Sequence, residues 1–318
     1  MRPSPSPAKV CPVCAGPLAL HMSAVSDPIT GFQFDILKCA VCGLGVTDPS
    51  PEQLQPYYAR YYGSRHAFTT AYCAKRRIAL VSKVTREGSG RRLLDVGCGD
   101  GMFLKVARTH GWQVTGTELN AGPARRAGFE VYQTLDECAS LAPFDCVTFW
   151  HSLEHMRDPR AVISKVRNLV ADDGFLFIAV PDFGGLQSKT FKSRWLHLDV
   201  PRHLYHFTAS SIDKMLQQSE FTPLAQWHQE IEYDLMGWSQ SALNVMLPTQ
   251  NVFFDLLTRK KVSAAALQKA VSWISGPLLS FASLPLVWLG SFARSGGTLL
   301  VAAQRVGPSA QRRQAATN

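Results

Sequence analysis

The sequence predicts an α/β protein with a doubly wound, mostly parallel sheet and a small cysteine-rich module in front of it. Three observations lead to this prediction. Short apolar runs alternate with segments of helical periodicity over residues 91–232. A glycine-rich turn joins the first of these runs to a helix. Two Cys-x-x-Cys pairs lie near the start of the chain.

The composition is typical of a folded chain of one or two domains. Of its 318 residues, 46% are hydrophobic and 18% are charged. The net charge of +9 is compatible with nucleic acid or an anionic membrane, but the basic residues form short, scattered clusters. Such clusters are typical of solvated helix faces and termini. Residues 1–8 are rich in proline and serine, so we expect disorder there, without a signal peptide or anchor. We therefore expect a cytoplasmic protein with reduced or metal-bound cysteines.

Residues 9–50 are predicted to form a small zinc-binding module that resembles a zinc ribbon. Four thiolates at this spacing suit one tetrahedral zinc ion. Gly43 suits the tight turn of a zinc knuckle, and a hairpin of residues 18–22 and 32–39 is expected between the two pairs. A redox-active pair or disulfides are the alternatives, but the βαβ context of a redox pair is absent. A four-cysteine site has no open position, so the zinc is expected to be structural. The expected ligands are Cys11, Cys14, Cys39 and Cys42.

A helical connector is expected over residues 51–90, with its main helix at 69–86. Four tyrosines precede that helix, and two interpretations of them stay open. They cover a ligand or line a substrate pocket, or they pack between the cysteine-rich module and the main domain. These residues are Tyr57, Tyr58, Tyr61 and Tyr62.

The main domain, residues 91–232, is expected to alternate strands with helices. The strands are predicted at 93–96, 113–117, 129–133, 145–149, 175–180 and 222–226, with a last one at 296–304. The helices are predicted at 102–107, 123–127, 159–170 and 210–219. Asp158 is the expected cap of the helix at 159–170, and a turn at 172–174 is expected to end it.

The turn after the first strand has the features of a nucleoside-binding site. Gly97, Gly99 and Gly101 allow a tight turn and close approach of the backbone to a ligand. Glu118 follows the second strand, where a carboxylate accepts hydrogen bonds from two ribose hydroxyls. The dinucleotide fingerprint G-x-G-x-x-G differs, because here Asp95 precedes the first glycine. That carboxylate would repel a pyrophosphate and attract an ammonium or sulfonium group.

This segment resembles motif I of the class I S-adenosylmethionine-dependent methyltransferases. An ordinary glycine turn in another doubly wound protein is the alternative. The resemblance implies a Rossmann-like, seven-stranded sheet with its last strand antiparallel, and S-adenosylmethionine as cofactor. It places Glu118 on the ribose and Leu119 beside the adenine. The cofactor-binding residues it implies are Asp95, Gly97, Cys98, Gly99, Gly101, Glu118, Leu119 and Trp150.

Residues 144–159 resemble the segment that follows strand four in the same family. The resemblance places the end of that strand beside the methyl group: Phe149, Trp150 and His151. His155 is a candidate catalytic base, although a turn histidine bonded to local backbone is the slightly favoured interpretation. Glu154 is either a residue of the acceptor site or only a hydrogen-bond partner within the turn.

Residues 195–208 are unusually rich in polar side chains for a connector. A similar Pro-Arg-His-x-x-His-Phe segment occurs in related methyltransferases, where this loop shapes the acceptor pocket. His203 and Tyr205 are therefore candidate acceptor contacts, and His203 is a candidate catalytic base. Its spacing from His197 and His206 matches no standard set of metal ligands.

A helical, apolar insertion is expected at 233–295, followed by the last strand at 296–304 and a tail at 305–318. Residues 270–293 carry no charge, but prolines and glycines interrupt them. We favour a helix that covers the substrate side or makes a dimer contact. Peripheral membrane contact through 270–293 is the second interpretation, and a membrane span is the least favoured. The oligomeric state is left open.

The predicted function is methyl transfer to a small molecule such as a sugar, a glycan or a secondary metabolite, at oxygen more often than at carbon. The chain lacks the Asn/Asp-Pro-Pro-Tyr/Phe turn of amino-directed nucleic-acid methyltransferases. It also lacks the Pro-Cys nucleophile of cytosine-C5 enzymes. Both absences argue against nucleic-acid bases as acceptors. The alternatives are an RNA- or protein-directed methyltransferase and a cofactor-binding protein without catalysis.

Overall fold

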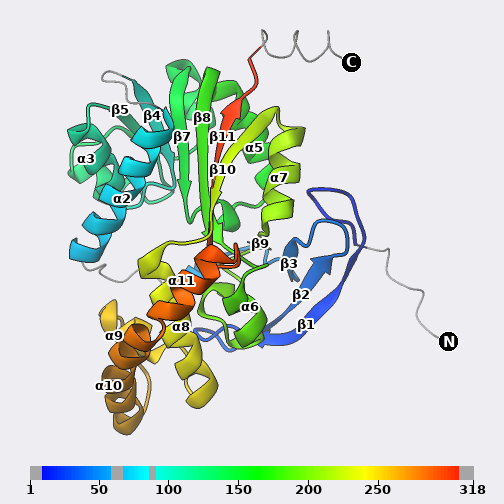
Figure 1. Cartoon of the computed structure of the whole chain (residues 1–318), viewed down its shortest axis with the longest axis vertical. Coiled ribbons are helices and arrows are strands. Elements are labelled where there is room, and N and C mark those ends of the chain that lie inside the picture. The colour runs from blue at the N-terminus through cyan, green and yellow to red at the C-terminus, as the bar shows by residue number, and fades with distance from the viewer. Residues whose placement is uncertain (1–8, 59–66, 86–90, 308–318) are drawn as a thin grey trace, which may run out of the picture. The chain divides into compact units, whose positions relative to one another are not determined.

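The computed structural model describes residues 9–58, 67–85 and 91–307 (Figure 1). The chain forms two compact units, each assembled from separate stretches of sequence. The unit that we call the cysteine unit comprises Met1–Arg65, Pro181–Lys214 and His228–Leu299. The unit that we call the core unit comprises His66–Val180, Met215–Trp227 and Leu300–Asn318. The predicted disorder of residues 1–8 concerns residues outside the described ranges.

A seven-stranded sheet forms the centre of the core unit, in the order β10-β11-β8-β7-β4-β5-β6 (Figure 1). Its strands are β4 (Arg92–Val96), β5 (Gln113–Thr117), β6 (Val131–Tyr132), β7 (Phe144–Trp150), β8 (Val170–Pro181), β10 (Phe221–Trp227) and β11 (Thr298–Arg305). The pairs β4–β5, β4–β7, β5–β6 and β7–β8 are parallel, whereas β11 runs antiparallel to β10. The predicted doubly wound sheet of seven strands is therefore confirmed.

The helices that accompany this sheet begin and end close to their predicted limits. They are α2 (Ala67–Thr85), α3 (Met102–Thr109), α4 (Gly122–Arg126), α5 (Pro159–Leu169) and α7 (Ala209–Gln218). The predicted cap of α5 is present, because Asp158 Oδ1 accepts the Ala161 N–H at 2.9 Å. Fully buried side chains from strands and helices, including Leu93, Leu104 and Phe177, form the core between them.

The turn predicted at 172–174 was wrong, because these residues lie inside β8. The pairing of β7 with β8 jumps from Phe144↔Val170 to Cys146↔Phe175, so four residues of β8 oppose one of β7. Asp173 takes a left-handed conformation with φ 61° within this irregularity. The polar residues therefore mark an irregular start of a strand, which continues to Pro181.

The cysteine unit contains a four-stranded antiparallel sheet in the order β1-β2-β3-β9. Its strands are β1 (Leu18–Ser26), β2 (Gln33–Cys39), β3 (Gly45–Asp48) and β9 (Tyr205–His206). The predicted hairpin is thus present as β1 and β2. The pairing of β3 with β9, Gly45↔His206 and Val46↔Tyr205, was not predicted. It makes the segment after strand β8 part of the same sheet as the N-terminal residues.

Short helices surround this sheet: α1 (Gln55–Tyr58), α6 (Leu186–Phe191), and the 3-10 turns at Lys192–Arg194 and Leu196–Leu198. The insertion is helical, as predicted, and consists of α8 (Ile231–Met246), α9 (Val252–Leu257), α10 (Ala266–Ala282) and α11 (Leu284–Phe292). Within the described ranges, no single helix is both long and apolar enough to cross a membrane. By length and composition, α10 and α11 meet that criterion only together, as a pair bent by 42°.

Candidate cofactor site and cysteine cluster

The predicted glycine turn follows β4 and is fixed to the end of β5. The backbone N–H groups of Gly97 and Cys98 both donate to Thr117 O, at 2.8 and 3.0 Å. Gly97 has φ 81°, and a Cβ there would lie 2.6 Å from the Ser152 Cβ. Ser152 Oγ in turn donates to Val96 O at 2.6 Å. Glycine at position 97 is therefore required by its conformation and by the turn after β7.

Gly99 differs from Gly97 in its surroundings. Its φ of 58° also favours glycine, but a Cβ at this position would meet no atom within 4 Å. Its N–H donates to Glu118 Oε2 at 3.0 Å. Gly101, by contrast, precedes α3 with φ 83°, and a Cβ there would lie 2.8 Å from the Phe129 ring. The turn thus leaves open space at Gly99, where a ligand can approach the backbone.

Glu118 directly follows β5, and its Oε2 accepts the Gly99 N–H of the glycine turn. Besides the bond from Gly99, its Oε1 accepts the Asn120 N–H at 3.3 Å. A carboxylate has about four acceptor positions, so two remain for hydroxyl donors. Leu119 is 81% exposed although it is apolar. The end of β5 therefore offers hydrogen-bond acceptors next to an exposed apolar side chain, which suits a ribose and its base.

Asp95 lies beneath the turn and is 2% exposed. Thr148 Oγ1 donates to its Oδ1 at 2.7 Å. Burial raises the pKa of Asp95 to about 7, and Thr148 and the positive charge of Arg77 only partly oppose this shift. A cation near the turn would favour the ionised carboxylate.

Cys98 is buried, and its Sγ occupies the space above Gly116, where a Cβ would lie 2.6 Å from the sulfur. Its contribution to the turn is therefore its backbone. Burial also raises the pKa of its thiol well above the usual range. These two facts make Cys98 a packing residue under the turn rather than a nucleophile.

Trp150 ends β7 and is buried to 7% exposure. Its ring packs edge-on against Phe103 at a centroid distance of 5.2 Å, and the Arg77 guanidinium lies 4.9 Å from its centroid. Its indole Nε1 has no hydrogen-bond partner among the described residues. Arg77 belongs to one of the short basic clusters of the sequence, residues 75–77, for which a solvated helix face was expected. For this residue the prediction was wrong, because Arg77 is only 9% exposed.

The turn after β7 brings together His151, Glu154 and His155. His151 has φ 53°, a left-handed conformation, and its N–H donates to Ala179 O at 2.9 Å. Its Nδ1 lies 3.7 Å from Oε1 of the buried Glu154. The half-buried His155 is the last residue of a 3-10 turn, Leu153–His155, and its N–H donates to Ser152 O at 3.2 Å. A strained backbone held by neighbouring strands is common at functional sites.

His203 and its neighbours lie in the cysteine unit, where their ring nitrogens bind oxygen atoms. His203 Nδ1 donates to His197 O at 2.9 Å, and His197 Nε2 donates to Tyr233 O at 3.0 Å. Thr47 Oγ1 gives its proton to His203 O at 2.7 Å, so it accepts from His206 Nε2 at 3.0 Å. The three rings thus bind three different oxygen atoms.

Arg202 has a structural role that was not predicted from the sequence. It is 1% exposed and binds the buried Asp27 at 2.9 Å and Asp199 at 2.7 Å. Burial alone would lower the pKa of Arg202, but the two carboxylates raise it, so the guanidinium stays charged.

Arg202 also donates to Tyr57 O at 3.2 Å. The Tyr57 ring packs edge-on against Phe34 at 5.8 Å, which favours the packing interpretation for this tyrosine. Tyr61 and Tyr62 lie outside the described residues.

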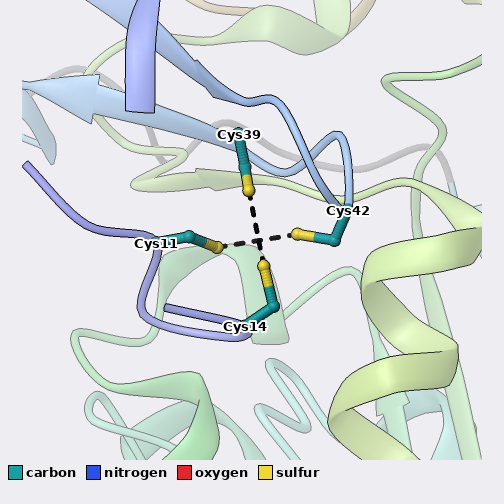
Figure 2. A group of neighbouring side chains, drawn as sticks. All are labelled: Cys11, Cys14, Cys39 and Cys42. Atoms are coloured by element: carbon teal, nitrogen blue, oxygen red, sulfur yellow. Dashed lines mark hydrogen bonds between the residues drawn. The ribbon is translucent and has the colours of Figure 1, made fainter. Parts of the chain in front are cut away.

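The four cysteines of the N-terminal module converge on one point (Figure 2). The distance from Cys11 Sγ to Cys42 Sγ is 3.6 Å, and that from Cys14 Sγ to Cys39 Sγ is 3.4 Å. All four sulfur atoms lie within 4.8 Å of one another, and none forms a disulfide. Tetrahedral zinc with Zn–S bonds of about 2.3 Å separates its sulfur ligands by roughly 3.8 Å. The cluster therefore has the size of a four-thiolate metal site.

Two similar knuckles produce this convergence. The Ala15 N–H donates to Cys11 O at 2.9 Å, and the Gly43 N–H donates to Cys39 O at 3.0 Å. Both Ala15 and Gly43 are left-handed, with φ 57° and 74°. Burial raises the pKa of the Cys39 thiol. The N–H groups of Cys42 and Val41 lower this pKa, and the overall value is about 7. Burial raises the pKa of the Cys11 and Cys42 thiols of the same cluster.

The doubly wound sheet places the glycine turn and Glu118 at the carboxyl ends of its strands, the edge at which such sheets bind ligands. A family model described as a methyltransferase domain matches residues 65–226, about half of the chain. The chain belongs to this methyltransferase family, which confirms the family resemblance of the glycine turn.

Similar proteins are known over shorter stretches. The ubiquinone biosynthesis O-methyltransferase of Cronobacter sakazakii is 35% identical over 102 residues, which cover 28% of this chain and 42% of that protein. The protein of the same name from Aeromonas salmonicida is 36% identical over 102 residues, 28% of this chain and 43% of that one. The chain thus spans less than half the length of these curated relatives.

Among solved structures, a SAM-dependent methyltransferase from Archaeoglobus fulgidus is 16% identical, with a TM-score of 0.45, and covers 74% of this chain and 94% of its own. The 1,6-didemethyltoxoflavin-N1-methyltransferase of Burkholderia thailandensis is 14% identical, with a TM-score of 0.45, and covers 84% and 96% respectively.

Proposed function

We propose that this protein transfers a methyl group from S-adenosylmethionine to a small-molecule acceptor, with oxygen as the preferred acceptor atom. The observation that supports the proposal most is the open position at Gly99, whose N–H is bound to Glu118 at 3.0 Å. The curated relatives named above are O-methyltransferases by name, which supports oxygen as the acceptor atom.

The residues of the turn fit the proposed cofactor. Glu118 would bind the ribose hydroxyls, the exposed Leu119 would pack against the adenine, and the backbone at Gly99 would approach the methionine part. The cofactor supplies an activated methyl group on a positively charged sulfur. Asp95, buried beneath the turn, favours positive charge there once it is ionised. Trp150 and Cys98 support the site by packing rather than by exposed polar atoms.

The protein's part in the reaction is to hold the acceptor in line and to remove its proton. His155 and His203 remain our candidates for the base. Because His203 Nδ1 carries the proton that it donates to His197 O, the basic lone pair of the neutral ring is on Nε2. A general base contributes roughly 10²–10⁴-fold to the rate. We therefore expect His155→Ala or His203→Ala to lower turnover, with the cofactor dissociation constant unchanged, for whichever residue is the base.

The acceptor is identified by incubating the protein with methyl-labelled S-adenosylmethionine and fractionated lysate from its own source. We expect the label in a small organic molecule, in a bond to oxygen. Label in RNA or in protein would contradict the proposed acceptor class. Tight cofactor binding without label transfer to any fraction would contradict catalysis itself.

We also propose that the four-cysteine cluster binds a structural zinc ion. Its support is the convergence of four free sulfur atoms within 4.8 Å. With four thiolate ligands the ion has no open position, so it holds the two knuckles together and takes no part in methyl transfer. The test is metal analysis of the purified protein. One equivalent of zinc per chain is expected, and a metal-free protein with a fully stable N-terminal sheet would contradict the proposal.

A further inference from the structure

The helices α10 and α11 present their large apolar residues outward and their small residues inward. Phe292 is 91% exposed, Leu267 is 77% and Phe281 is 76%. The buried residues of the two helices are Ser272, Gly276, Val287 and Gly290. This arrangement is the reverse of an ordinary surface helix, whose large apolar side chains face the core.

The inward face of α10 has no room for larger side chains. A Cβ on Gly276 would lie 2.5 Å from the ring of Phe253 on α9, so the two helices are in close contact there. At about 100° per residue, four exposed apolar residues of α10 fall within an arc of roughly 60° on the opposite side. They are Leu267, Ile274, Leu278 and Phe281. The exposed stripe is therefore a second apolar face, separate from the one that packs inside the unit.

Every charged residue that follows α9 in the sequence is basic. Asp255 is the last acidic residue of the chain, and its carboxylate lies 3.8 Å from Lys260 Nζ. Beyond it, basic residues lie before α10, within it and after α11: Arg259, Lys260, Lys261, Lys269 and Arg294. Two tryptophans lie on the exposed surface, Trp273 at 57% and Trp288 at 62% exposure. Tryptophan prefers the boundary between lipid and water, and lysine and arginine are attracted to anionic headgroups.

We propose that α10 and α11 bind the surface of an anionic lipid bilayer, with their apolar stripe in the region between headgroups and acyl chains. The bend of 42° between two short helices suits a position along the interface. A second copy of the chain fits less well, because a symmetric contact would join two surfaces that carry the same excess of positive charge. The proposal concerns the surface at which the protein acts, and it does not depend on the identity of the methyl acceptor.

The test is sedimentation of the full chain with phospholipid vesicles. We expect binding to vesicles of phosphatidylcholine with phosphatidylglycerol, at least tenfold weaker binding to phosphatidylcholine alone, and weakening by salt. Phe281→Glu and Phe292→Glu change exposed residues and should each reduce binding at least about tenfold. Leu20→Glu is the matched control, because Leu20 is an apolar residue of the same unit that is 61% exposed on β1.

Removal of charge is an independent test. Arg259→Gln with Lys261→Gln should weaken binding to anionic vesicles and leave the melting temperature unchanged, because both residues are exposed. Lipids brominated near the headgroup should quench tryptophan fluorescence, and less so in Trp288→Phe. The proposal is overturned if anionic vesicles do not bind the protein, or if Leu20→Glu reduces binding as much as Phe281→Glu. It is also overturned if Phe281→Glu dissociates a dimer in solution while vesicle binding stays unchanged.

Discussion

The open position at Gly99 allows a substitution that separates cofactor binding from stability. In Gly99→Ala, the new Cβ meets no protein atom within 4 Å, so the protein is affected only through the left-handed conformation at φ 58°. An L-residue in this conformation costs about 1–2 kcal/mol relative to glycine. If the space is the cofactor site, the same methyl group also blocks the approach of the ligand to the backbone.

Gly128 offers the matched control. It lies in the same unit, has φ 82°, and a Cβ there also meets nothing within 4 Å. Gly128→Ala should therefore carry the same conformational cost of about 1–2 kcal/mol, with no effect on the cofactor. For a chain of this size, that cost lowers the melting temperature by about 2–8 °C.

The assay is calorimetric titration of both variants with S-adenosylmethionine, alongside thermal unfolding. We expect similar losses of melting temperature, but a dissociation constant at least about tenfold higher for Gly99→Ala only, which corresponds to about 1.4 kcal/mol of binding free energy. Equal affinity in the two variants would refute the assignment of the Gly99 space to the cofactor.

Three further predictions concern buried charges and the cysteine cluster. Because burial raises the pKa of Asp95 from 3.8 to about 7, the folded state binds this proton more tightly than the unfolded state, and stability should fall as pH rises from about 4 to 7. At about 1.4 kcal/mol per pH unit, the free energy of unfolding should fall by roughly 4 kcal/mol over this range. Asp95→Asn should not show this fall. The prediction is contradicted if the difference in urea-unfolding free energy between wild type and variant does not change with pH. Arg202→Met should destabilise the protein by about 3–5 kcal/mol, because the buried Asp27 loses its partner, and a variant within 1 kcal/mol of wild type in urea unfolding would show that the pair is dispensable. Removal of metal by a chelator, or Cys14→Ser, should lower the melting temperature through loss of the N-terminal sheet, whereas Cys138→Ser, at a buried cysteine outside the cluster, should leave the zinc content unchanged.

Local patterns in the sequence were sufficient to predict most of the core unit. The strand at 113–117 was predicted with the limits it has in the structure, where its last three residues are buried. The glycine turn and Glu118 were also predictable, since their interactions join residues about 20 positions apart.

Long-range contacts explain what the sequence did not reveal. Strand β9 has two residues and pairs with β3, about 160 positions earlier in the chain, so no local pattern announces it. Arg77 appears in a run of basic residues, but its burial depends on the Trp150 ring, which is contributed by another element. The order Asp172-Asp173-Gly174 is typical of a turn, but here these residues lie within β8, at the point where its register with β7 shifts.

The central claim is that Gly99 and Glu118 form the binding site of S-adenosylmethionine. Its most direct test is equilibrium binding of this cofactor to the wild-type protein and to Glu118→Ala. Wild type should bind one cofactor per chain, in competition with S-adenosylhomocysteine. Glu118→Ala should bind at least about tenfold more weakly, because the ribose loses its acceptors and the Gly99 N–H loses its partner. Absence of binding by the wild type, or equal affinity of the variant, would contradict the claim.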